Sequence, residues 1–187
     1  MQYRIYLFAI LFLMQFKAAP ALADPATTEL IFPQYASIPT NGSAIVGLFG
    51  VEADVWSVTS FNELRRDGLA VERQNFLHPE AEEQDAYITS CLKGRQGPVI
   101  ASTDYMRSFA DQIRPWVKSP YSVLGTDGFG RSDSRQKLRH FFEVDRHFVV
   151  LAALNALRKE GKVDAATVKQ AIEQYGIDTD KPYPVMH

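Results

Sequence analysis

The segment PVIASTDYMRSFADQI, residues 98–113, places the pattern of a buried strand directly before the pattern of a helix. Pro98–Ser102 is a short apolar run, which is typical of a strand buried inside a sheet. Thr103 is expected to cap the helix that follows. Apolar side chains then recur at spacings of three and four, which predicts a buried helix face made of Met106, Phe109, Ala110 and Ile113.

Similar units lie on both sides of this segment. The β-branched and aromatic runs Val55–Phe61 and Tyr121–Leu124 each predict a strand. Asn62–Asp67 is short and polar, and Gly68 is expected to end it. Helices are expected at Glu80–Leu92, at Gln136–Phe142, after a cap at Asp145 and after a cap at Asp164. This alternation predicts an α/β fold, a three-layer αβα domain with a mainly parallel sheet.

The composition narrows the class of protein. A chain of 187 residues has room for one domain with appendages. Lys and Arg total 20 against 22 for Asp and Glu, so the net charge is -2, and a nucleic-acid binder with a broad basic surface is not expected. A single cysteine, Cys91, rules out an intrachain disulfide and a zinc site made of cysteines.

Residues 1–23 have the pattern of a secretory leader. Arg4 supplies a positive charge, Ile5–Phe16 is an apolar run, and the small-x-small pattern of signal peptidase sites ends at Ala23. The apolar run is shorter than the ~20 residues of a membrane-spanning helix, so no stable span is expected once the leader is removed. The alternative is an apolar segment that comes from an unusual or misassigned translation start.

Residues 24–49 are expected to be a linker or a degraded start of the domain, since Pro25, Pro33 and Pro39 interrupt every regular pattern. Residues 50–187 are predicted to form the folded domain.

A glycine-rich loop is the most distinctive candidate site. It leaves a strand and enters a helix, where free backbone N–H groups can hold an anion, and its arginines could add charge. The candidate anion-binding residues are Gly125, Gly128, Gly130, Arg131 and Arg135. The alternative is a tight turn whose glycines relieve strain and whose arginines pair with Asp127 or Asp133. The glycine order matches neither the dinucleotide fingerprint nor a P-loop.

No catalytic or metal-binding residue is expected elsewhere. His140 and His147 lie on either side of a predicted helix break, and no two histidines have the i, i+4 spacing of a helical zinc pair. No serine lies in a nucleophile elbow. Cys91 is expected near a helix C-terminus, where the dipole disfavours a thiolate.

Several long strings resemble one family, the last domain of the homodimeric, decarboxylating component of pyruvate dehydrogenase, a domain of the transketolase C-terminal type. The resemblance extends from about Gly50 to the end of the chain. It is carried by residues 51–68 (VEADVWSVTSFNELRRDG), 101–106 (ASTDYM), 109–114 (FADQIR), 124–133 (LGTDGFGRSD), 142–145 (FEVD) and 175–178 (YGID). Gln74 stands where the family usually has an aromatic residue.

The resemblance implies oxidative decarboxylation of pyruvate by the intact enzyme, which binds thiamine diphosphate and Mg²⁺ in earlier domains. This chain has no Gly-Asp-Gly, with which the family's diphosphate motif begins, so no cofactor is expected here. The resemblance also implies a homodimer, the other components of the complex as partners, and a cytoplasmic location, unless the leader directs secretion to the periplasm or beyond. The family's first strand and helix are expected to be lost.

Two functions follow from these observations. The chain is interpreted as a C-terminal fragment of the decarboxylating component that supports the dimer and is inactive alone. The alternative is an exported, non-enzymatic binding module that reuses the same domain.

Overall fold

The computed structural model describes residues 3–9, 49 and 51–186, which fold around one four-stranded sheet. The strand order is β2-β1-β3-β4, and all three pairings are parallel. The strands are β1 (Tyr3–Ala9), β2 (Val51–Ser57), β3 (Val99–Ser102) and β4 (Tyr121–Leu124). The predicted α/β class with a parallel sheet is confirmed.

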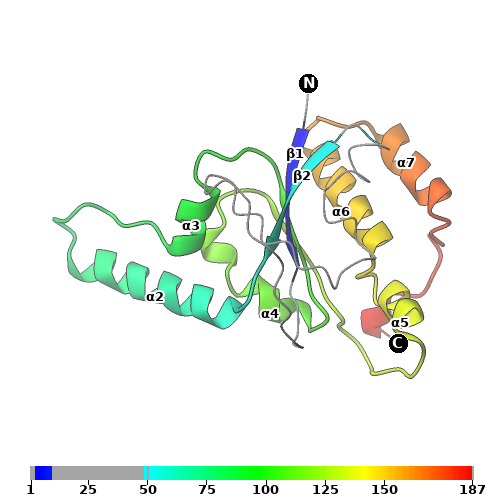
Figure 1. The fold of residues 1–187 in the computed structure, drawn as a ribbon, viewed down its shortest axis with the longest axis horizontal. Coiled ribbons are helices and arrows are strands. Elements are labelled where there is room, and N and C mark those ends of the chain that lie inside the picture. Colours follow the sequence, from blue (N-terminus) through cyan, green and yellow to red (C-terminus); the bar gives the residue numbers. More distant parts are fainter. Residues whose placement is uncertain (1–2, 10–48, 50, 187) are drawn as a thin grey trace, which may run out of the picture.

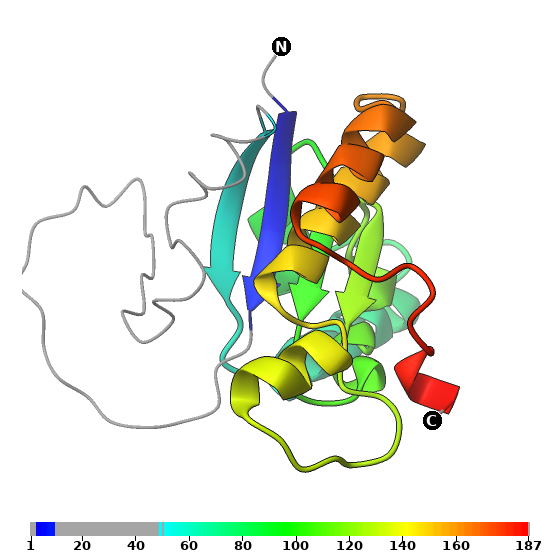
Figure 2. The same ribbon diagram turned by 90° about the vertical axis from the view of Figure 1, so that its right-hand side faces the viewer.

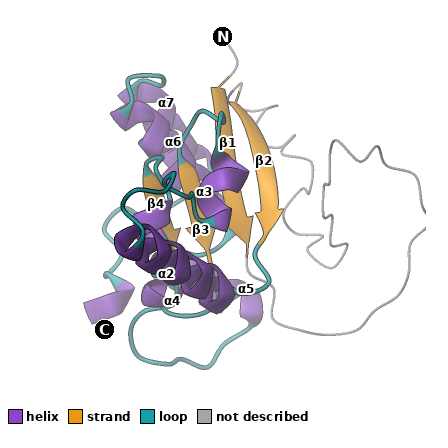
Figure 3. Cartoon of the chain, turned by 90° about the vertical axis from the view of Figure 1, so that its left-hand side faces the viewer, coloured by secondary structure: helices purple, strands orange, loops and turns teal. Residues whose placement is uncertain are grey.

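Helices cover both faces of the sheet (Figure 1). The helices are α2 (Phe61–Leu77), α3 (Tyr87–Leu92), α4 (Arg107–Asp111), α5 (Arg135–Phe141), α6 (Arg146–Lys159) and α7 (Ala165–Gln174). One layer holds α2, α3 and α4, and the opposite layer holds α6 and α7, while α5 lies beyond the strand tips (Figures 1 and 3). Two 3₁₀ turns complete the described structure, Arg114–Trp116 and Pro184–Met186.

Side chains that alternate along β3 divide the core in two. Val99 and Ala101 belong to the core beneath α2, α3 and α4, whereas Ile100 belongs to the core beneath α6 and α7. This is the period of two that a strand imposes on its side chains. All three residues are fully buried, because both faces of a parallel sheet are covered by helices.

Strand β1 comes from the segment that the sequence predicts as a leader. Residues 3–9 pair with β2 over Tyr3↔Val51 to Ala9↔Ser57, and residues 6–9 pair with β3 over Tyr6↔Val99 to Ala9↔Ser102. The expected loss of a first strand therefore needs a correction: a strand does precede β2, and it lies in the middle of the sheet (Figure 2). Two further predictions concern residues that the structure does not describe. They are the loss of the family's first helix and the linker up to residue 48.

Helix α2 corrects the prediction for residues 55–68. The strand ends at Ser57, and Ser60 caps a helix by accepting a hydrogen bond from the amide of Glu63 at 3.2 Å. Gly68 does not end the segment, because the helix continues to Leu77. Gly68 is buried against Trp116, and a Cβ at this position would overlap the indole ring.

Two other predicted helices are shorter than expected. Only the end of Glu80–Leu92 is helical, as α3, and α4 begins after Met106 rather than at a Thr103 cap. The Thr103 hydroxyl instead accepts the amide of Tyr105 at 3.0 Å, which turns the chain before the helix starts. Met106 is therefore exposed, while the rest of the predicted stripe, Phe109, Ala110 and Ile113, packs in the core.

The two C-terminal helices begin where the sequence predicts. Asp145 caps α6 and Asp164 caps α7, each through its carboxylate. Hydrogen bonds from Thr167 lower the pKa of Asp164, as expected for a capping carboxylate. Gly161 and Gly176 follow the two helices with φ of 70° and 59°, values that favour glycine. Among the described residues, no helix combines the length and the apolar character that crossing a bilayer would need.

Candidate functional site

The candidate residues gather at the carboxyl ends of the strands. The chain leaves β4 at Leu124, passes through the glycine-rich loop, forms α5 and turns into α6 (Figure 2). In open parallel sheets, ligands bind outside this edge. Both features that the described residues offer as sites, the glycine-rich loop and a group of two histidines and an aspartate, lie here.

The glycines of the loop allow the backbone to pack closely. A Cβ at Gly125 would lie 2.6 Å from the amide nitrogen of Arg107, and next to it the Thr126 amide donates to the Tyr105 carbonyl at 2.8 Å. Gly128 has a φ of 119°, and a Cβ at this position would overlap the carbonyl of Pro184 in the C-terminal segment. Gly130 has nothing near its Cβ position. Two of the three glycines are thus explained by chain packing.

The arginines of the loop have partners within the domain. Arg131 lies over the ring of Phe141 at 4.1 Å, and Arg135 lies 3.7 Å from the Asp104 carboxylate. Neither pairs with Asp127 or Asp133 as the alternative interpretation expected; Asp127 instead accepts the Arg107 amide at 3.0 Å. Helix α5 has seven residues, and Ser134 caps it by accepting the Lys137 amide. Anion binding by this loop stays a prediction.

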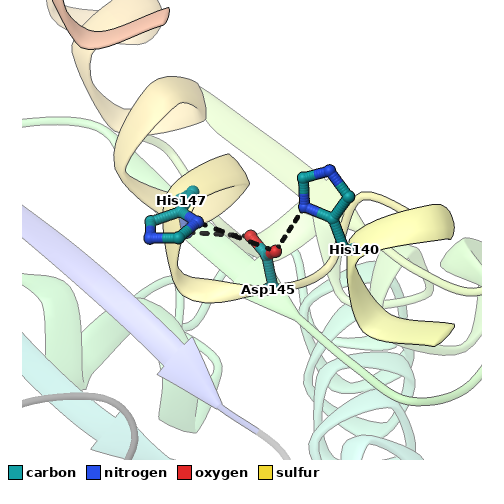
Figure 4. A group of neighbouring side chains, drawn as sticks. All are labelled: His140, Asp145 and His147. Atoms are coloured by element: carbon teal, nitrogen blue, oxygen red, sulfur yellow. Dashed lines mark hydrogen bonds and ion pairs between the residues drawn. The ribbon is translucent and has the colours of Figure 1, made fainter. Parts of the chain in front are cut away.

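Two histidines converge on one carboxylate where α5 turns into α6 (Figure 4). The Nδ1 of His140 lies 2.9 Å from Oδ2 of Asp145, and the Nδ1 of His147 lies 3.9 Å from the same oxygen. One ligand atom from each residue lies within 4.8 Å of the other two. This His-Asp-His group is the densest set of metal-ligand side chains in the described part of the chain.

Both histidine rings of the group pack against an aromatic side chain. The ring of His147 stacks on Tyr175 with 4.6 Å between centroids, and the ring of His140 packs on Phe148 at 5.4 Å. Burial raises the pKa of the Tyr175 hydroxyl, so this ring stays neutral beside His147. All three side chains of the group are partly buried.

No spacing rule used on the sequence groups these three residues. The rule for helical zinc pairs requires both histidines on one continuous helix, and here the chain reverses between them. The turn is made by Glu143, whose φ of 62° is unusual for a residue with a side chain. The pattern His-x₄-Asp-x-His across a predicted break is the signal that could have identified the group.

Asp145 has a structural role that can be measured. Its Oδ1 accepts the amides of His147 at 2.9 Å and Phe148 at 3.1 Å. Asp145→Ala is expected to lower the free energy of unfolding by about 1–2 kcal/mol, because two amides of α6 lose their acceptor. Asp145→Asn keeps an acceptor, so it should lower the free energy of unfolding by less than half as much. Urea denaturation measures both losses. Equal losses for the two variants would show that the charge matters and the cap does not.

An open parallel sheet with helices on both faces and irregular loops at its carboxyl edge defines the class, a three-layer α/β domain. Within that class, the chain belongs to the family of transketolase-like C-terminal domains, whose model matches residues 41–145, more than half of the chain.

Curated relatives agree with this family. The chain is 65% identical over 138 residues to the pyruvate dehydrogenase E1 component of Pseudomonas aeruginosa, covering 73% of this chain and 16% of the relative. It is 56% identical over 137 residues to the same component of Cupriavidus necator and 53% identical over 137 residues to that of Escherichia coli K12, each time over 73% of this chain and 15% of the relative. The predicted resemblance is confirmed, and the chain spans about one sixth of these relatives.

Proposed function

We propose that this chain is the C-terminal domain of a pyruvate dehydrogenase E1 component, that it supports the fold and the dimer of that enzyme, and that it does not decarboxylate pyruvate alone. One observation carries the proposal: the 65% identity covers 138 residues of this chain and only 16% of the relative. The matched region therefore corresponds to about one sixth of the relative's length.

Exposed apolar side chains support a role in packing against other parts of an enzyme. They lie on segments that contact one another at the carboxyl edge of the sheet, since the loop after β4 packs on both Tyr105 and Pro184. The exposed residues there are Tyr105, Met106, Phe129, Tyr183, Val185 and Met186. Apolar groups gathered on a surface are typical of a protein contact.

The residues present do not fit thiamine diphosphate. Of the described residues, the glycine-rich loop is the segment whose composition suits a diphosphate. Two of its three glycines pack against backbone, and its arginines contact Asp104 and Phe141. The 187 residues contain no Gly-Asp-Gly. Both observations support the proposal that the cofactor is held by other domains of the family enzyme.

An activity assay tests this function. The purified chain is incubated with pyruvate, thiamine diphosphate, Mg²⁺ and an artificial electron acceptor, and the full-length E1 component of Pseudomonas aeruginosa serves as the positive control. We expect acceptor reduction no faster than in buffer. Turnover that rises in proportion to the concentration of this chain would contradict the proposal.

A further inference from the structure

We propose that His140, Asp145 and His147 form a binding site for a divalent transition-metal ion of the Zn²⁺ class. Two imidazole nitrogens and one carboxylate oxygen form this site at the turn from α5 into α6 (Figure 4). Neutral imidazole is the commonest metal ligand in proteins, and Zn²⁺ accepts nitrogen and carboxylate oxygen together. The site is independent of the proposed function.

The distances are close to those of a metal-bound set. Zinc ligands lie at ~2.0–2.2 Å from the ion, so two of them in a tetrahedral site are roughly 3.3 Å apart. Asp145 Oδ2 lies 2.9 Å from His140 Nδ1 and 3.9 Å from His147 Nδ1, which are values on either side of that separation. Small rotations of the two rings would bring both nitrogens to a shared ion.

Asp145 is already oriented for this role. Its Oδ1 is held by two backbone amides of α6, so Oδ2 points to the histidines without needing a further support. The main chain on the other side is fixed by Lys181, whose Nζ donates to the carbonyls of His140 at 3.0 Å and Phe141 at 2.7 Å and pairs with Glu143 at 3.3 Å. Fixed ligand atoms lose little freedom when an ion binds.

Charge and protonation around the site are compatible with an ion. Glu143 pairs with the nearby Lys181, and the Nε of Arg146 donates to Nε2 of His147 at 3.3 Å. Coordination through Nδ1 would leave a proton on Nε2, so the Nε of Arg146 would no longer donate to that nitrogen. Arg146 is exposed, and an exposed contact between polar groups contributes little to stability. Three protein ligands leave a fourth position to water.

Cobalt and zinc titrations of the untagged full chain test the site at pH 7.5. Co²⁺ gives visible d–d absorption when it is bound by nitrogen and oxygen ligands, and isothermal titration calorimetry with Zn²⁺ gives the stoichiometry. We expect one ion per chain and at least a tenfold weaker affinity in both His140→Ala and His147→Ala. Neither substitution removes the side chain that caps α6, so both variants should fold, which circular dichroism will check.

Two matched controls exclude other ligands. His78→Ala removes an exposed imidazole outside the group, and Cys91→Ser removes the single thiol. Both are expected to bind Co²⁺ as the unaltered chain does. The proposal is overturned by the absence of saturable binding at about 1 mM Zn²⁺. It is equally overturned by binding that persists unchanged in both histidine variants.

Discussion

Deleting residues 1–9 is expected to abolish cooperative folding of the domain. Strand β1 lies inside the sheet, between β2 and β3, and is paired with both. Its loss would leave the facing backbone groups of β2 and β3 without partners and would expose their buried faces to water. The free energy of unfolding of a domain of this size is only about 5–15 kcal/mol. We expect the loss of a central strand to cost more than this.

Thermal unfolding followed by circular dichroism measures this effect. A chain that lacks only residues 1 and 2, which precede the strand, is the control and is expected to melt like the full chain. The shortened chain should show no cooperative transition and should bind a hydrophobic dye. If the chain without residues 1–9 melts with the same midpoint as the control, strand β1 contributes nothing to stability.

Strand β1 lies within the segment that is predicted to be a cleaved leader, so the two uses can be distinguished by experiment. Removal after Ala23 would take β1 away, so residues 3–9 cannot serve as a cleaved leader and as a strand in the same mature protein. Sequencing the amino terminus of the protein isolated from cells distinguishes the two uses. A terminus at Met1 or Gln2 is expected if the strand is retained, whereas a terminus at Asp24 would support export.

Gly68→Ala is expected to destabilise the domain by about 2–3 kcal/mol, in spite of the higher helix propensity of alanine. A Cβ at this position in α2 would overlap the ring of Trp116, which is buried in the core beneath that helix. Either the indole or the helix must move, and both are packed against neighbours. Urea denaturation with an unchanged m-value measures the loss.

A matched glycine provides the control. Gly130→Ala adds the same methyl group where nothing lies within 4 Å, and it is expected to change stability by less than about 0.5 kcal/mol. Trp116→Leu should partly rescue Gly68→Ala, because it removes the ring that the new methyl group meets. Equal losses for Gly68→Ala in the presence and absence of Trp116 would disprove the steric explanation.

Patterns within one segment predicted most of the fold. β3, β4 and the capped starts of α6 and α7 follow from apolar runs and aspartate caps that each lie within a few residues. The sequence predicts a stop at Gly68, because glycine often marks the end of a regular segment. Glycine is present at this position because a Cβ would overlap Trp116, which lies 48 positions later in the sequence. No rule based on neighbouring residues contains that contact.

The remaining differences have similar causes. Ser60 and Glu63 form the Ser-x-x-Glu pattern of a helix start, but this pattern overlaps the end of a β-branched and aromatic run that favours a strand. The leader pattern of residues 1–23 is also an apolar segment long enough for a strand, and only pairing with β2 and β3 selects that use. His140 and His147 meet because of the turn at Glu143, which composition does not indicate.

Calorimetric titration of the purified chain with thiamine diphosphate, in a buffer that contains Mg²⁺, tests the central proposal most directly. We expect no saturable heat up to about 1 mM cofactor, while the full-length Pseudomonas aeruginosa component binds under the same conditions. A saturable isotherm with one cofactor per chain would contradict the proposal that this domain depends on the rest of the enzyme for its coenzyme.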